Sequence, residues 1–175
     1  LWTDKFDEKK QSDFQLRDYN QTIAGVFVQN NWNLTNWLDL ETGLRTDYVA
    51  DYGVAVLPRI SAHFKITDKF SSRLGGGFGY KAPTVFTEDS EKRQYRDVLP
   101  IDKDKNKLER SYGLNWDFNY VTSFGGGNVT FSVNQLFFYT YLDSPLLLQP
   151  ATGGMYQLNN IKGHTDSKGG ETNVK

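Results

Sequence analysis

The sequence has no cysteine, which excludes disulfides, thiolate metal ligands and cysteine catalysis. It also lacks any apolar run of about 18 residues, so no transmembrane helix is expected. The formal net charge is only -1, without a basic tract, and nucleic acid is therefore not expected as a partner. Histidine is scarce as well. His63 and His164 lie far apart without clustered carboxylates, so we predict no metal site, no cofactor and no catalytic residue, and we do not expect an enzyme.

Aromatic residues are abundant, at 15% of the chain, and they favour β-strands and the interfaces of membranes. No segment keeps a helical period, whereas many alternate between apolar and polar residues. This alternation predicts an all-β fold, an antiparallel up-and-down meander of about seven strands. The predicted strands cover residues 21–34, 37–48, 56–66, 70–80, 108–122, 129–142 and 165–175.

The two faces of these strands differ in chemistry. Ile60 and Phe64, for example, alternate with Arg59 and His63. Nearly unbroken apolar faces opposite faces that carry full charges are typical of a barrel wall between lipid and a wet lumen. The residues predicted to face the lumen are Glu41, Arg45, Arg59, His63, Arg73 and Asp117.

The connections between the predicted strands alternate in length. Short turns lie near residues 35–36, 67–69 and 123–128, and longer links cover 49–55, 81–107 and 143–164. Short turns at one end and long loops at the other are typical of outer-membrane barrels. Aromatic residues are predicted to form a girdle near each end: Trp32, Trp37 and Phe70 beside the short turns, and Tyr48, Tyr80, Tyr139 and Tyr141 beside the long loops.

Three motifs resemble the barrel of TonB-dependent receptors. A strand entered through Pro58-Arg59-Ile60 is followed by a glycine-rich and aromatic strand that ends in Lys81-Ala82-Pro83, with lysine where arginine is commoner. The strand over residues 108–116 is similar to the next one in the family, although it lacks the usual proline and has Asn115 near the usual acidic position. Residues 167–173 resemble a later strand start. The order and spacing of the three motifs match the middle to late part of such a barrel.

This resemblance implies energised import across the outer membrane of a Gram-negative bacterium. Such barrels have about 22 strands around a plug. The chain would supply about a third of them, and it begins on Leu1 rather than methionine and ends within a predicted strand. We therefore interpret it as a fragment: residues 1–20 a loop or strand end, residues 21–175 a partial barrel, and the plug and remaining strands absent. The implied partners are the plug of the full-length protein, the TonB energy complex reached through the missing N-terminal part, outer-membrane lipid, and an extracellular siderophore, cobalamin, glycan or peptide.

The loops contain the remaining candidates. Arg93, Tyr95 and Arg96 lie in the longest loop and are predicted to contact ligand. The apolar residues 146–148 are expected to pack on neighbouring loops rather than to touch ligand. Residues 102–107 resemble the start of a calcium loop, but lysine stands at its sixth position, where glycine is required, and a solvated loop is expected instead.

Gly75-Gly76-Gly77-Phe78-Gly79 lacks the spacing of a nucleotide loop. Glycines within a strand allow curvature or close approach of another chain segment, and in a plugged barrel that segment could be the plug. Two alternatives stay open from the sequence. A passive porin shares the strand pattern. A soluble β-sandwich binding module also alternates, but its apolar faces would pack against each other.

Overall fold

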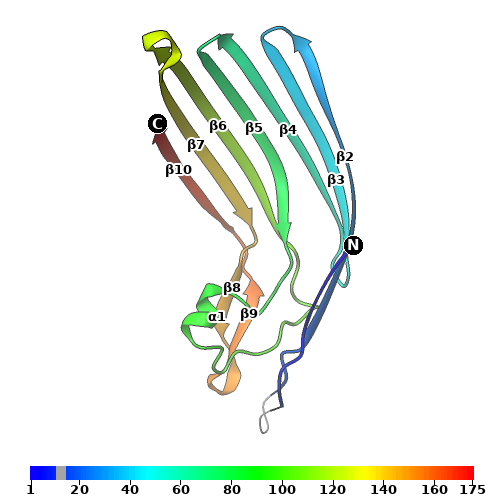
Figure 1. Ribbon diagram of the computed structural model, residues 1–175. Helices are drawn as coiled ribbons and strands as arrows, with labels where there is room; N and C mark the ends of the chain where they lie inside the picture. Colours follow the sequence, from blue (N-terminus) through cyan, green and yellow to red (C-terminus); the bar gives the residue numbers. More distant parts are fainter. Residues whose placement is uncertain (11–14) are drawn as a thin grey trace.

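The computed structural model describes residues 1–10 and 15–175, and these residues form one large curved antiparallel sheet (Figure 1). Within the described residues the sheet has eight strands in the order β1-β2-β3-β4-β5-β6-β7-β10. They are β1 (Trp2–Phe6), β2 (Tyr19–Thr35), β3 (Leu38–Val49), β4 (Gly53–Thr67), β5 (Phe70–Lys81), β6 (Glu109–Phe124), β7 (Val129–Asp143) and β10 (His164–Val174). The predicted antiparallel meander is confirmed, with β1 as an additional strand.

The register separates apolar from charged residues, because direct cross-strand neighbours share a face. Leu40 lies opposite Ala62, Ala62 opposite Leu74, and the row continues through Trp116 to Phe137. Trp116 and Phe137 are 47% and 48% exposed, so in the described residues no second sheet covers this face. That arrangement fits a lipid-facing wall and does not support the sandwich.

Both long connections lie at one end of the sheet and three short turns at the other, while the short β3–β4 turn shares the end of the long connections (Figure 1). The β2–β3, β4–β5 and β6–β7 turns lie together at one end, and the last of these contains the 3-10 turn η1 (Gly125–Gly127). The connections over residues 82–108 and 144–163 lie at the other end. The link expected over residues 49–55 is shorter than predicted, because both strands of this hairpin extend to a three-residue turn at 50–52.

The two long connections fold together into a small unit, here called the loop unit. It contains α1 (Glu88–Lys92), the hairpin of β8 (Leu146–Pro150) and β9 (Tyr156–Asn160), and the 3-10 turn η2 (Thr152–Gly154). Val98, Leu146 and Leu158 are buried in it, and Val98 bridges to Tyr156 of β9. The apolar residues 146–148 thus form part of a packed hairpin, and Leu146 is its buried member.

Residues 1–20, expected to be a loop or strand end, include β1, whose residues pair with Tyr19–Ile23 at the start of β2. The charged residues of this segment obscure a short strand in which Trp2, Asp4 and Phe6 alternate with Thr3 and Lys5. None of the helices among the described residues is long and apolar enough to cross a membrane.

Candidate functional site

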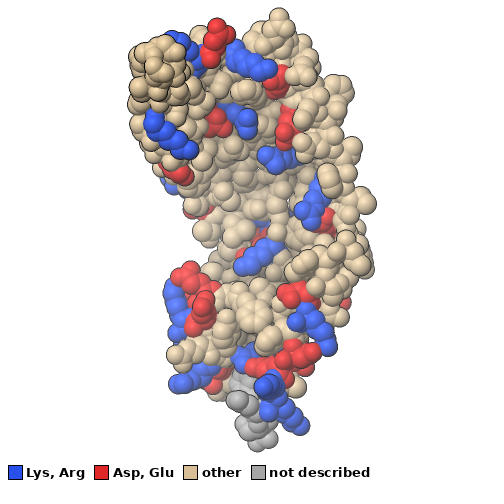
Figure 2. Space-filling view, viewed as in Figure 1, with Lys and Arg blue, Asp and Glu red and all other residues tan. Residues whose placement is uncertain are grey.

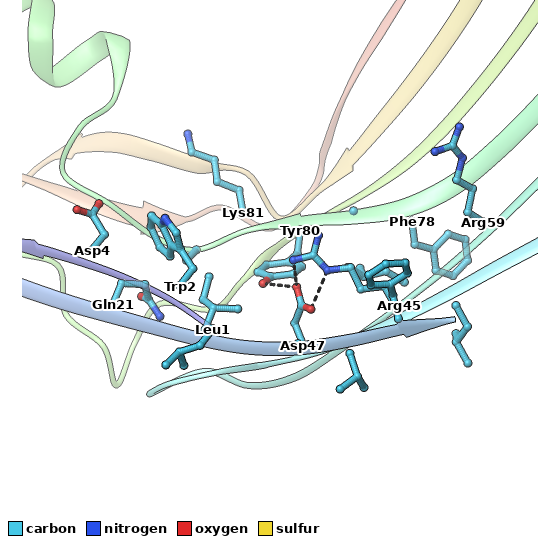
Figure 3. Close-up of a pocket in the computed structure, with 18 of the residues that line it drawn as sticks. Leu1, Trp2, Asp4, Gln21, Arg45, Asp47, Arg59, Phe78, Tyr80 and Lys81 are labelled. Atoms are coloured by element: carbon cyan, nitrogen blue, oxygen red, sulfur yellow. Dashed lines mark hydrogen bonds and ion pairs between the residues drawn. The ribbon is translucent and has the colours of Figure 1, made fainter. Parts of the chain in front are cut away.

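A groove of about 1120 Å³ opens near the long-loop end of the sheet (Figure 3). Its lining combines three basic side chains with several aromatic rings, and the acidic residues at its wall are Asp4 and Asp47. The basic residues are Arg45, Arg59 and Lys81, and the aromatic residues are Trp2, Tyr19, Phe27, Phe78, Tyr80 and Phe86. Such a lining can bind an anionic solute with flat or apolar parts, through charge and through ring stacking.

The groove forms where two strands of the sheet separate. The β4–β5 ladder ends at the pair of Arg59 and Gly77, whereas β5 stays paired with β6 as far as Lys81 and Glu109. Pro58 directly precedes Arg59 in β4, and it has no N–H to donate to β5. The end of β5 can therefore turn away from β4, and its side chains enter the groove.

Asp47 of β3 is the centre of a polar network in this groove. Its side chain is completely buried and accepts hydrogen bonds from Nε of Arg45 to Oδ1 and from the Tyr80 hydroxyl to Oδ2, each 2.8 Å long. A second guanidinium nitrogen of Arg45 lies 2.8 Å from Oδ2, so the ion pair is bidentate. Both partners converge on the carboxylate in Figure 3. Tyr80 was predicted to belong to an aromatic girdle, which stays a prediction, and its hydroxyl binds Asp47 where β4 and β5 have separated.

The six residues predicted to face the lumen share one face of the sheet. His63 opposes Arg73, which opposes Asp117, and the others follow by the two-residue period of β3 and β4. Two of the six, Arg45 and Arg59, line the groove. Their facing a lumen stays a prediction.

The charges on this face occur in pairs rather than as one block of a single sign. Nε of Arg59 lies 3.9 Å from a carboxylate oxygen of Glu41. Asp39 forms an ion pair with Lys65, whose Nζ lies 2.7 Å from Oδ2 of Asp39, and the same oxygen lies 3.6 Å from Nδ1 of His63. Figure 2 shows basic and acidic side chains interspersed on the face in view.

The structure places the predicted loop contacts outside the groove lining. Arg93 lies over the ring of Tyr156, with Cζ 3.5 Å from the ring centroid. Tyr95 packs edge-on against Phe86, whose ring lines the groove, and Arg96 is exposed. Arg93 and Tyr95 thus contribute to the packing of the longest loop, and ligand contact by Arg93, Tyr95 and Arg96 stays a prediction.

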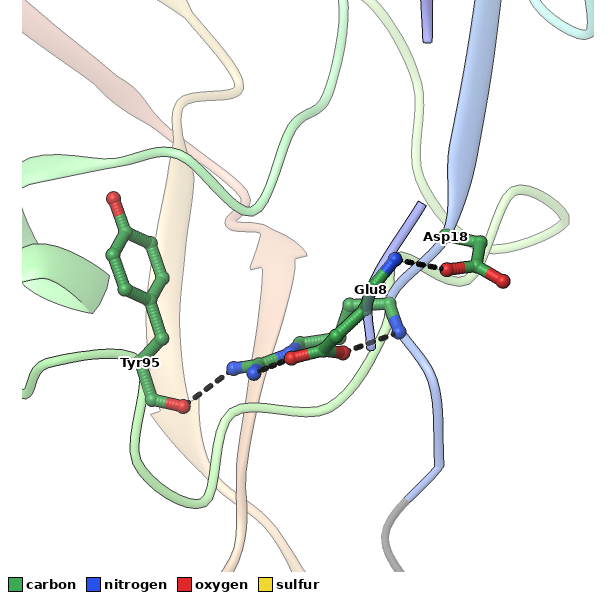
Figure 4. A network of polar contacts seen from close by, with 4 residues as sticks. Glu8, Asp18 and Tyr95 are labelled. Carbon is green, nitrogen blue, oxygen red and sulfur yellow. Dashed lines mark hydrogen bonds and ion pairs between the residues drawn. The ribbon is translucent and has the colours of Figure 1, made fainter. Parts of the chain in front are cut away.

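A second polar network joins the N-terminal hairpin to the longest loop (Figure 4). Glu8 accepts hydrogen bonds from the guanidinium and the backbone N–H of Arg17, and the same guanidinium donates to the carbonyl oxygen of Tyr95 at 2.5 Å. The side chains of Glu8 and Arg17 are 19% and 15% exposed. The hydrogen bonds from Arg17 hold the pKa of Glu8 below its ordinary value.

The calcium-like run is folded as a turn of the loop unit. Asp102 accepts hydrogen bonds from the backbone N–H groups of Asp104 and Lys105, and the Lys105 ammonium lies 2.9 Å from its carboxylate. This ammonium lowers the pKa of Asp102, and it neutralises the carboxylate charge that would attract a metal cation. Over residues 1–10 and 15–175, no group of three or more histidine, cysteine, aspartate or glutamate residues is placed to hold a metal ion.

Sequence reasoning missed several residues of the groove. Phe27 was visible as an apolar exception on a polar face, and it lies directly opposite Arg45. Asp47 shares the two-residue period of Glu41 and Arg45, so the pattern could have found it. Nothing in the local sequence pointed to Trp2, because its position in the groove depends on the pairing of the N-terminal segment with β2.

A meander of long strands, apolar on one face, charged on the other and with both long connections at one end, defines the wall of a transmembrane β-barrel. Residues 3–175 match the family described as TonB dependent receptor-like, beta-barrel. The chain belongs to this family, and its sheet is an unclosed part of such a barrel. A search of curated proteins gave no match.

Three solved structures show the same fold. The siderophore receptor PirA of Pseudomonas aeruginosa superposes with a TM-score of 0.71 and 18% identity, over 90% of this chain and 29% of that one. A mutant of the ferric enterobactin receptor PfeA of the same species gives 0.69 and 18%, over 91% and 25%. A double mutant of the Serratia marcescens hemophore receptor HasR, in complex with its hemophore HasA and heme, gives 0.73 and 14%, over 90% and 32%. The chain thus spans a quarter to a third of the length of these receptors.

Proposed function

We propose that this chain is part of an outer-membrane, TonB-dependent transporter that binds a ferric siderophore or heme at the cell surface and imports it. The groove is the observation that carries the proposal. It places Arg45, Arg59 and Lys81 among aromatic rings at the long-loop end of a sheet that belongs to this family. Many ferric siderophores are anionic, and heme offers both a flat ring system and carboxylates, so either solute is complementary to such a lining.

The full-length protein would supply what this chain lacks. In the proposal its plug fills the lumen, the TonB energy complex acts on its N-terminal part, and lipid of the outer membrane covers the apolar face of the sheet. Glu41, His63, Arg73 and Asp117 would then present charges to the plug or to passing solute. The proposal is supported by the family and by the separation of an apolar from a charged face.

Uptake by cells tests the function. A strain without the gene is complemented with the full-length protein or with its Arg45→Ala/Arg59→Ala variant, and uptake of radiolabelled iron from ferric enterobactin and from heme is measured with and without active TonB. We expect TonB-dependent uptake of one of them and a reduced rate in the variant. Lys65→Ala, outside the groove lining, is the matched control. TonB-independent uptake of small solutes would favour the porin, and cobalamin, glycan or peptide uptake would identify a different solute.

Cell fractionation tests the location. An antibody against this chain is expected to detect a heat-modifiable band several times larger than 20.0 kDa in the outer-membrane fraction. A 20.0 kDa band in a soluble fraction would contradict the transporter and favour a binding module.

A further inference from the structure

We infer that Asp47 is a positioning residue of the groove, which fixes Arg45 and Tyr80 in place and acts on a bound solute only through them. The inference rests on the proposed function, because it takes the groove as the place where the solute binds. It adds a role for a residue that does not itself touch the solute.

Burial separates the role of Asp47 from that of Arg45. The Asp47 side chain is 0% exposed, whereas the Arg45 side chain is 58% exposed in the groove. A solute can therefore reach the guanidinium but not the carboxylate. A buried carboxylate is costly unless it is paired and hydrogen-bonded, and Asp47 meets this requirement through Arg45 and Tyr80.

The bidentate pair restricts the orientation of Arg45. Two guanidinium nitrogens bind the two oxygens of one carboxylate, which fixes the plane of the guanidinium as well as its position. An arginine held in this way loses less conformational freedom when it binds an anion. Arg59 provides a contrast in the same groove, because its side chain is 71% exposed and its Nε lies 3.9 Å from Glu41.

The bond to Tyr80 fixes the other wall of the groove. Tyr80 belongs to β5 and Asp47 to β3, and the β4–β5 ladder has ended before this level. The hydroxyl thus connects two strands that are not neighbours in the sheet. Gly25, which opposes Asp47 on β2, leaves the space that the carboxylate needs. Three strands of the groove are therefore arranged around one acidic side chain.

The test uses the full-length protein in detergent, with Asp47→Asn as the variant and Asp39→Asn, on the same face of β3 but outside the groove lining, as the control. Modification of individual arginines by phenylglyoxal is followed by mass spectrometry, and the affinities for ferric enterobactin and heme are measured by fluorescence quenching. Asparagine is uncharged and has a single acceptor oxygen, so it cannot replace the two carboxylate oxygens that bind Arg45 and Tyr80. We therefore expect faster modification of Arg45 but not of Arg59, and affinity lower by about tenfold.

Tyr80→Phe, which keeps the carboxylate and its pair with Arg45, is a second variant that should fold even if Asp47→Asn does not. It should lower the affinity by a smaller factor and leave Arg45 as slow to react as in the unsubstituted protein.

The outcomes separate this inference from the proposed function. Unchanged Arg45 reactivity in Asp47→Asn, or equal acceleration at Arg45 and Arg59, would show that Asp47 does not position Arg45 specifically. Unchanged affinity in both variants, with the unsubstituted protein binding a probe, would overturn the inference and leave the proposed function standing. If the unsubstituted protein binds neither probe, the proposed function fails and the inference fails with it.

Discussion

A Cβ atom placed on Gly25 would overlap Oδ1 of Asp47, its direct cross-strand neighbour. Real side chains do not approach so closely, so any residue larger than glycine at position 25 must displace the buried carboxylate. The glycine of β2 and the aspartate of β3 thus depend on each other, and the groove beside them depends on both.

Replacing Gly25 with alanine is expected to destabilise the folded barrel by about 1–3 kcal/mol, because the new Cβ must displace the Asp47 carboxylate from its bonds to Arg45 and Tyr80. The measurement is the urea midpoint at which the heat-modifiable band of the full-length protein is lost. Gly43→Ala is the matched control on the neighbouring strand, since its new Cβ would meet Val28 O at 3.8 Å, an ordinary contact. Equal midpoints for the two variants would contradict the argument.

The strands and their faces could be predicted because they follow from a local rule. Alternation in the third predicted segment identified Ile60 and Phe64 as one face and Arg59 and His63 as the other, and the register agrees. The ends of the seven predicted strands differed by at most about three residues, and β1 was not predicted. The family motif through Lys81-Ala82-Pro83 also pointed to the fold that the family match shows.

The groove could not be predicted in the same way, because it depends on contacts between distant residues. Tyr80 was assigned to a membrane girdle by its place beside a long loop, and the bond of its hydroxyl to Asp47 depends on the end of the β4–β5 ladder at Arg59. Arg93 was chosen for its charge and its place in the longest loop, yet it stacks on Tyr156, which lies more than sixty positions later in the sequence. Strand periodicity carries no information about such pairings.

Asn106→Ala is expected to loosen the loop unit. The Asn106 side chain is buried and donates to Asp102 O at 2.9 Å and Leu158 O at 3.1 Å, while its oxygen accepts from Asn160 N. Removing it leaves buried backbone groups without partners, at a cost of about 1–3 kcal/mol. Hydrogen exchange of the β8–β9 amides should become faster. Asn159→Ala, on the other face of β9, should leave it unchanged, and similar exchange in both variants would contradict this role.

The contact of the N-terminal hairpin with the longest loop is expected to weaken in acid. The pKa of Glu8 in the folded protein is lower than its ordinary value of 4.5, because Arg17 donates hydrogen bonds to the carboxylate. The carboxylate therefore stabilises this contact above pH 4.5, and the contribution is lost as the pH falls below 4.5 and through the lowered pKa. Hydrogen exchange of residues 15–20, corrected for intrinsic rates, should show this loss in the unsubstituted protein. Glu8→Gln should remove the pH dependence, and a variant that keeps it would assign the effect to another group.

Arg93→Ala is expected to expose the longest loop to proteases. The guanidinium lies 3.5 Å from the centre of the Tyr156 ring, and a cation–π contact of this kind contributes about 0.5–1 kcal/mol at an exposed site. Its loss should raise the rate of cleavage between residues 93 and 97, where Gln94, Tyr95 and Asp97 already adopt positive φ angles that cost energy in non-glycine residues. Arg96→Ala removes an equal charge from the same loop without touching the stacked pair, so its cleavage rate should match that of the unsubstituted protein. If the two variants are cleaved equally fast, net charge rather than stacking controls the order of the loop.

Solute affinity measured on the same two variants then decides whether either arginine contacts ligand directly, because Arg96→Ala would lower affinity without loosening the loop only if Arg96 meets the solute itself.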